Sequence, residues 1–140
     1  RWLKMIGLVV ITHGQMAEEC VRSAEMIIGP IAGCRAISID RNCSVDKATD
    51  SLNRAISEVG ADGDGVLILT DMFGGTPTNI AADFIVPGRV DILTGVNLPL
   101  LIKAASARNQ KELVEFADFL LGYGQQSILR PAELLKVRSK

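Results

Sequence analysis

Residues 5–14 read Met-Ile-Gly-Leu-Val-Val-Ile-Thr-His-Gly, and this segment indicates how the chain folds. Its residues 6–11 are apolar without interruption, which is typical of a strand buried on both faces of a sheet. Beyond it, apolar side chains recur at helical spacing until Gly29 and Pro30, a pair that stops helices. A doubly buried strand followed at once by a helix predicts an α/β fold.

The same strand-then-helix order recurs three more times along the chain. Ser44 is expected to cap the second helix and Thr76 the third, with Pro77 at the first helical position. The segment 130–140 is expected to be a solvated tail. We predict strands at 6–11, 34–39, 66–69 and 89–93, and helices at 16–28, at 45–59, from 77 onward, from just after residue 97 to about 108, and at 111–121. We also predict a short edge strand at 127–129.

Strands that alternate with helices form a parallel sheet with right-handed crossovers and helices on both faces. In such a sheet the carboxyl ends of all strands lie at one edge, and ligands bind where the strand order reverses. That edge then carries residues 12–14, 71–76 and 95–97. With the strand order 2-1-3-4, we expect His13 and Asp71 to flank the crevice.

Composition excludes several classes of protein. A chain of 140 residues without repeats or linkers predicts a single domain over residues 1–140. With 48% hydrophobic and 22% charged residues it is typical of a globular rather than a disordered protein. The net charge of −1 offers no support for a nucleic-acid partner. No apolar run approaches the roughly 18–20 residues of a membrane helix.

The chain contains one histidine and three cysteines. A single histidine excludes mechanisms that need two, and also histidine-rich metal sites. An odd number of cysteines without C-x-x-C spacing predicts neither a disulfide framework nor a zinc site. We therefore expect a cytoplasmic protein with no metal and no cofactor.

His13 is the strongest candidate for chemistry, because a neutral imidazole is a nucleophile that can carry a phosphoryl group transiently. One ring nitrogen must then be held by a hydrogen-bond acceptor so that the other can attack. Asp71 is placed to be that acceptor, as in catalytic triads.

A phosphoryl group also needs hydrogen-bond donors. Backbone N–H groups around Gly74 and Gly75, the Thr76 hydroxyl and the amino end of the third helix are candidates for this role. Thr12 and Gly14, which flank the histidine, complete the predicted phosphate-binding set, and Gly14 allows a close approach of the backbone.

Simpler interpretations of the same residues remain open at this point. A histidine after a strand is often structural, and an aspartate before glycines is often a turn residue. The sequence Gly-Gly-Thr-Pro is also common in loops that connect a strand to a helix. Two sharper motifs, G-x-G-x-x-G and G-x-x-x-x-G-K-[ST], are absent, so dinucleotide binding and P-loop chemistry are not supported. Mutase-type histidine phosphatases need an arginine before the histidine and a second histidine, and both are missing here.

Three segments resemble a known family: residues 5–14, residues 69–79 (Leu-Thr-Asp-Met-Phe-Gly-Gly-Thr-Pro-Thr-Asn) and residues 95–99 (Gly-Val-Asn-Leu-Pro). The family is the enzyme IIA component of the mannose/fructose/sorbose class of the bacterial phosphoenolpyruvate-dependent sugar phosphotransferase system. The similarity extends from residue 5 to about residue 121.

This resemblance implies that His13 accepts a phosphoryl group from the phosphocarrier HPr. His13 then passes the group to a histidine of a IIB component, which phosphorylates sugar entering through a membrane permease. It also implies that Asp71 orients His13, that the Thr76 hydroxyl lies beside the phosphate, and that neither metal nor nucleotide takes part.

Family members are homodimers with an exchanged C-terminal strand, which we place at residues 127–129. Residues 1–4 precede the usual start of the family. Because no fused IIB domain follows the tail, we expect any IIB component to be a separate chain.

Three other functions remain open. The phosphohistidine could report metabolic state to a regulator without sugar flux. The chain could be the phosphocarrier domain of a dihydroxyacetone kinase, although the Asp-Met-Phe-Gly-Gly-Thr-Pro run is not expected there. It could also be a small-ligand binding module in which His13 is structural.

Overall fold

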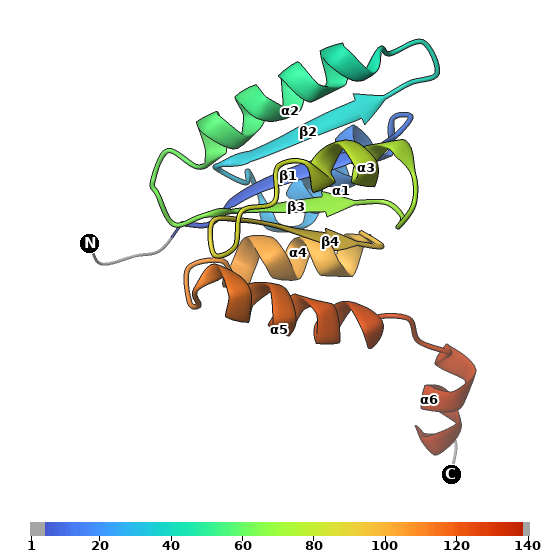
Figure 1. Cartoon of the computed structure of the whole chain (residues 1–140). Coiled ribbons are helices and arrows are strands. Elements are labelled where there is room, and N and C mark those ends of the chain that lie inside the picture. Colours follow the sequence, from blue (N-terminus) through green and yellow to red (C-terminus); the bar gives the residue numbers. More distant parts are fainter. Residues whose placement is uncertain (1–4, 139–140) are drawn as a thin grey trace.

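The computed structural model describes residues 5–138 (Figure 1). Strands and helices alternate through the first four strands, and helices alone follow. The elements are β1 (Gly7–His13), α1 (Met16–Ile28), β2 (Cys34–Ile39), α2 (Val45–Val59), β3 (Val66–Thr70), α3 (Thr76–Ala82), β4 (Val90–Thr94), α4 (Leu98–Ala107), α5 (Leu113–Gln125) and α6 (Pro131–Arg138).

The four strands form one sheet in the order β2-β1-β3-β4, and all three pairs are parallel. This confirms the predicted α/β class and strand order. In the register between the central strands, Ile11 of β1 lies opposite Thr70 of β3. The loops that follow these two strands therefore leave the sheet side by side at its carboxyl edge.

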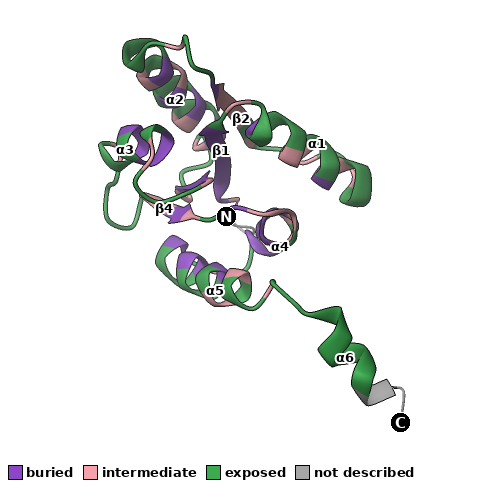
Figure 2. Cartoon of the chain, turned by 90° about the vertical axis from the view of Figure 1, so that its right-hand side faces the viewer, coloured by how far each residue is buried: buried purple, intermediate pink, exposed green. Residues whose placement is uncertain are grey.

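Side chains of β1 alternate between two cores, which explains why its sequence is apolar from residue 8 to residue 11. Leu8 and Val10 pack into a core shared with α1, α4 and α5. Val9 and Ile11 pack into a second core shared with α2 and α3. Figure 2 shows β1 between these two groups of helices.

Gly7 is the small residue that lets α2 approach the sheet. A Cβ at this position would lie 2.4 Å from the carbonyl oxygen of Val59, the last residue of α2. A larger side chain would push α2 off β1. Glycine at the start of an otherwise bulky strand is thus a packing requirement.

The helix caps agree with the sequence in one case and differ in another. The Ser44 hydroxyl accepts a hydrogen bond from the Lys47 N–H at 3.1 Å, which confirms it as the cap of α2. The prediction for Thr76 was wrong, because Gly75 occupies the cap position with an extended backbone. The helix α3 therefore begins one residue earlier than expected, with Thr76 first and Pro77 second.

The C-terminal segment differs from the expected tail. Residues 131–136 are exposed, as predicted, but they belong to the helix α6, which projects from the rest of the chain (Figure 2). Pro131 suits a first helical position, and Arg130 pairs with Glu133 at 3.6 Å. In this single chain residues 127–129 form no strand. Their exchange would need a second copy and stays a prediction.

Residues 1–4, expected to be additional to the family, lie outside the described part of the chain. Between residues 5 and 138 there is no helix with the length and apolar character needed to cross a membrane.

Candidate functional site

The predicted site lies where the two central strands end. His13 is the last residue of β1, and Asp71 directly follows β3. Because β1 and β3 are parallel neighbours in the sheet, both residues reach the same edge. The structure thus brings together the two residues that sequence reasoning placed on either side of the crevice.

Asp71 holds His13 through a single carboxylate oxygen. Oδ2 of Asp71 lies 2.8 Å from Nδ1 of the His13 ring and also accepts the His13 backbone N–H at 3.0 Å. The other oxygen, Oδ1, accepts the backbone N–H of Met72 at 3.0 Å. The His13 side chain is 49% exposed, whereas that of Asp71 is 12% exposed. The carboxylate of Asp71 is therefore largely buried and held by three hydrogen bonds, whereas the His13 ring that it contacts is accessible.

These contacts set the charge of Asp71 and the tautomer of His13. Burial by itself would raise the pKa of Asp71, but hydrogen bonds from the His13 backbone and ring, together with the ring's charge, outweigh it and lower the pKa. An ionised carboxylate can only accept hydrogen bonds, so Nδ1 carries the proton. In the neutral ring the lone pair is then on Nε2, the nitrogen that Asp71 leaves free.

Gly75 lies against the imidazole ring. A Cβ on this residue would lie 2.6 Å from Cε1 of His13 and 3.2 Å from Nε2. A distance of 2.6 Å between a Cβ and a ring carbon is too short for any residue with a side chain. Only glycine at position 75 therefore lets the His13 ring stay where Asp71 holds it. This is a more specific role than the general backbone donor expected from the sequence.

A pocket of about 560 Å³ opens beside the ring and is lined by His13, Gly14 and Thr76. Gly74, which is exposed, has a positive φ of 91° in the loop before α3. Among the predicted phosphate-binding residues, Gly14 and Thr76 therefore share a cavity with His13, and Gly74 and Gly75 lie in the adjoining loop.

Thr12 has a different position from the one expected. It is fully buried, and its hydroxyl accepts the backbone N–H of Ala17 at 2.7 Å. It also donates to the carbonyl of His13 at 3.1 Å. Gln15, at the cap position of α1, makes no side-chain cap bond. The Thr12 hydroxyl instead accepts one of the backbone N–H groups of the first turn, which have no partner within the helix. It thus supports the backbone on either side of His13 and is not exposed on the pocket.

Sequence reasoning also missed a buried pair of hydroxyl groups. The Thr78 hydroxyl donates to the carbonyl of Met72 at 2.6 Å, and the Thr70 hydroxyl lies 2.7 Å from the Thr78 oxygen. Since Thr78 donates its one proton to the carbonyl, Thr70 must be the donor within the pair. This chain of hydrogen bonds ties the loop after Asp71 to both β3 and α3. The Thr-Pro-Thr sequence was its only signal.

The remaining residues that line the pocket come from the loop between β2 and α2 and from the two residues that flank it: Ile39, Asp40, Arg41, Cys43 and Val45. This loop is distant from His13 in sequence and reaches it only because β2 is adjacent to β1 in the sheet. No motif in the sequence pointed to it.

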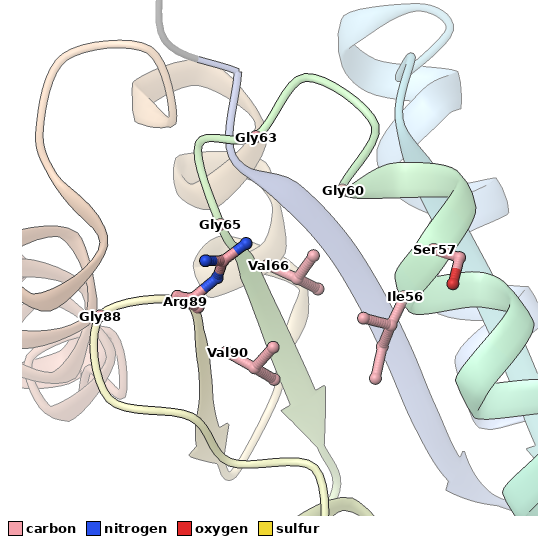
Figure 3. Close-up of a pocket in the computed structure, with 9 residues that line it drawn as sticks. All are labelled: Ile56, Ser57, Gly60, Gly63, Gly65, Val66, Gly88, Arg89 and Val90. Atoms are coloured by element: carbon pink, nitrogen blue, oxygen red, sulfur yellow. The ribbon is translucent and has the colours of Figure 1, made fainter.

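A second pocket lies at the opposite edge of the sheet, where β3 and β4 begin (Figure 3). It measures about 150 Å³ and is lined by four glycines and by Ile56, Ser57, Val66, Val90 and the exposed Arg89. None of its lining residues is a histidine, cysteine, aspartate or glutamate, so it offers no general base or nucleophile comparable with His13. Within residues 5–138 no group of three or more such side chains is arranged to hold a metal ion.

A family model described as "PTS system fructose IIA component" matches residues 7–121. This range includes all four strands and the entire His13 site. The chain belongs to this family. Three short motifs led to the IIA assignment, and the match now covers the sheet and most of the helices that pack on it.

Relatives agree with the family. A PTS system fructose-specific EIIA component of Bacillus subtilis is 32% identical over 124 residues, covering 88% of this chain and 84% of that protein. A PTS system mannose-specific EIIAB component of Escherichia coli is 30% identical over 105 residues, 74% of this chain but 32% of that protein. The chain therefore spans about a third of that two-component relative.

A solved structure also matches. The crystal structure of the PTS IIA protein associated with the fucose utilization operon from Streptococcus pneumoniae superposes with a TM-score of 0.80 at 28% identity. It covers 92% of this chain and 95% of that one. The IIA fold thus extends beyond the matched residues 7–121 to most of the chain.

Proposed function

We propose that this IIA chain is a phosphoryl carrier of a sugar phosphotransferase system, in which His13 accepts phosphate from HPr and passes it to a IIB component. One observation carries the proposal: Asp71 engages Nδ1 of an exposed histidine and leaves Nε2 free. The family membership supplies the system in which such a histidine works.

The transfer is a displacement at phosphorus. Nε2 of His13 attacks with its lone pair, a new Nε2–P bond forms, and the P–N bond to the donor histidine breaks with its electron pair going to the donor ring. His13 becomes positively charged as this bond forms, and Asp71 stabilises that charge through the proton on Nδ1. Return of the electron pair to Nε2 during the second transfer regenerates the neutral ring.

The phosphoryl oxygens would lie in the pocket beside the ring. Gly14 and Thr76 line this pocket, and the loop of Gly74 and Gly75 borders it. Backbone N–H groups in glycine-containing turns and a hydroxyl are suitable donors to a phosphate. Fixed donors of this kind stabilise charge on the transferring group without rearrangement.

Exposed apolar side chains next to the site favour a protein as donor and acceptor. Phe73 is 81% exposed, Met72 is 55% exposed, and Met16 and Val45 are also exposed. A cluster of this kind around one reactive group is typical of a surface that meets another protein. HPr and a IIB component are such partners, and both are protein phosphocarriers.

The remaining parts of the proposal concern assembly and location. We expect a homodimer, a cytoplasmic location, contact with the membrane permease only through the IIB component, and no nucleic-acid partner. We also expect the reaction to need no cofactor, because the proposed nucleophile, orienting acceptor and hydrogen-bond donors all come from the chain.

The test is phosphorylation by HPr followed by onward transfer. Incubation with phosphorylated HPr should add one acid-labile phosphate to the wild-type chain, detected by intact mass, and none to His13→Gln. Adding the IIB component should then discharge the label. Labelling of His13→Gln, or an unlabelled wild type, would overturn the carrier role. Labelling without discharge by any IIB component of the same cell would favour the regulatory alternative.

A further inference from the structure

We propose that Arg41 is the cation that neutralises the phosphoryl group while it is on His13. This inference rests on the proposed function and assigns a residue to the same site. Arg41 belongs to the loop between β2 and α2, which the sequence motifs do not include. It lines the same pocket as His13, Gly14 and Thr76.

Hydrogen bonds hold this loop beside the histidine. The Gly14 N–H donates to the carbonyl of Ile39 at 2.8 Å, which joins the ends of β1 and β2 immediately after His13. In the loop itself, Oδ1 of Asp40 accepts the Asn42 N–H at 2.9 Å, and the Asp40 carbonyl accepts the Cys43 N–H at 3.2 Å. Arg41 therefore extends from a turn whose backbone is already ordered on the wall of the pocket.

The charges of the site require a cation. A phosphoryl group brings about two negative charges next to the ionised Asp71, and Asp40 adds another carboxylate to the pocket wall. Of the residues that line the pocket, Arg41 is the only one with a positively charged side chain. The positive charge of the phosphorylated ring is balanced by Asp71, so without Arg41 no cationic side chain of the pocket would offset the phosphoryl group and Asp40.

Arg41 is also available for this role. It is exposed, and within residues 5–138 it makes no ion pair, whereas Arg35 on the neighbouring strand is paired with Glu58. A guanidinium group presents a planar set of donors that matches two phosphate oxygens at once. The combination of position, charge and free donors points to the phosphoryl oxygens as its partner.

The experiment measures the equilibrium distribution of phosphate between HPr and this chain, by phosphorus NMR of a mixture of the two proteins. In Arg41→Gln we expect the distribution to shift toward phosphorylated HPr by about tenfold, equivalent to about 1.4 kcal/mol. Arg41→Lys should recover part of this shift, because it keeps the charge but not the planar fork. Arg54→Gln, an exposed arginine of α2 outside the pocket, should match the wild type.

An equilibrium separates this role from docking, because it depends only on the free and phosphorylated proteins and not on how they meet. If Arg41→Gln slows the exchange but leaves the distribution unchanged, Arg41 contacts HPr and the proposal is wrong. The proposal is equally wrong if Arg54→Gln shifts the distribution as much as Arg41→Gln does. A wild type that takes up no phosphate at all would instead overturn the proposed function.

Discussion

His13 obtains its chemistry from what touches its ring on each side. Asp71 accepts a hydrogen bond from Nδ1–H, Gly75 leaves room for the ring, and the ring lines a pocket. A phosphocarrier needs only one such residue per chain, since the next histidine belongs to the partner protein. The single histidine in the sequence is therefore sufficient for the whole proposed reaction.

Replacing Asp71 by asparagine tests the orienting role. Asparagine replaces one of the two accepting oxygens by an NH₂ group, which then faces a backbone N–H of either His13 or Met72 and disturbs the position of the ring. The negative charge that stabilises the ring as it becomes positive is lost in both orientations. We expect Asp71→Asn to fold and to accept phosphate at least about a hundredfold more slowly, measured by rapid quench with phosphorylated HPr. Asp50→Asn, an exposed carboxylate on α2, is the matched control. Equal rates in Asp71→Asn and wild type would remove the orienting role.

The lowered pKa of Asp71 also predicts a pH dependence of stability. A carboxyl group whose pKa is lower in the folded state stabilises the fold above its unfolded pKa, and this contribution is lost as the pH falls through the folded pKa. Urea unfolding should show a larger difference between wild type and Asp71→Asn at about pH 7 than at about pH 3. A difference that grows on acidification would contradict the assignment.

Patterns in the sequence were sufficient to predict that His13 and Asp71 meet and that Gly14, Gly75 and Thr76 lie near the ring, but not the positions of Thr12 and Arg41. His13 and Asp71 both follow buried strands, so their meeting at one edge needs only the strand order. The position of Thr12 beneath the site depends on where α1 begins, and that of Arg41 on which strand lies beside β1. Neither can be read from local spacing.

At the scale of elements, the loop of residues 71–75 must keep a fixed conformation for Asp71 and Gly75 to position the His13 ring. It connects β3 to α3, and the hydroxyl groups of Thr70 and Thr78 tie it to both. Gly75 ends the loop as the cap of α3 and contacts the His13 ring. The position of α3 therefore determines, through this loop, where the His13 ring and its Nε2 can lie.

A methyl group at position 75 tests this contact. Gly75→Ala should displace the ring from Asp71 and slow phosphate acceptance by about a hundredfold, while the cores, which are elsewhere, keep the chain folded. The His13 ring resonances should shift in NMR spectra. Gly122→Ala is the control, because a Cβ at that position in α5 meets nothing within 4 Å. Normal activity in Gly75→Ala would show that the ring does not depend on this contact.

Removing the Thr78 hydroxyl tests the support of the loop. In Thr78→Val the Met72 carbonyl and the Thr70 hydroxyl lose their buried partner, which should lower the free energy of unfolding by about 1–3 kcal/mol. Phosphate acceptance should also slow, because the loop is no longer tied to α3. Thr49→Val, which removes a hydroxyl bonded within α2 alone, should change neither by as much. Identical effects of the two variants would refute the special role of Thr78.

Most elements were predictable because buried strands leave continuous apolar runs and glycine or proline marks the ends of helices. The core strand at residues 66–69 was found to within one residue, and the cap Ser44 was confirmed. The helix α6 was not predicted, because its two leucines, Leu134 and Leu135, are adjacent and exposed and form no apolar stripe at helical spacing. Thr76 was placed one position wrong, since glycine, without a side chain to signal it, caps α3.

At the scale of the whole molecule, the sheet brings three distant segments to one edge. Residues after β1, β2 and β3 meet there because β1 lies between the other two strands. The proposed reaction uses all three segments, for the nucleophile, the neutralising cation and the orienting carboxylate. The strand order is thus the feature of the fold on which the site depends.

The expected homodimer is a prediction at the same scale. Sedimentation equilibrium should give twice the mass of one chain, and removal of residues 127–140 should give a folded monomer, because the exchanged segment is expected within them. Circular dichroism of the truncated chain should keep the features of the sheet and the remaining helices. A full-length monomer, or a truncated chain that still dimerises, would contradict the exchange.

Because the chain contains one histidine, nitrogen-15 NMR of its ring reports on His13 alone. In the free protein the neutral ring should carry its proton on Nδ1. After reaction with phosphorylated HPr, Nε2 should show coupling to phosphorus while Nδ1 keeps its proton against Asp71. Phosphorus coupled to Nδ1, or a neutral ring protonated on Nε2, would contradict the mechanism.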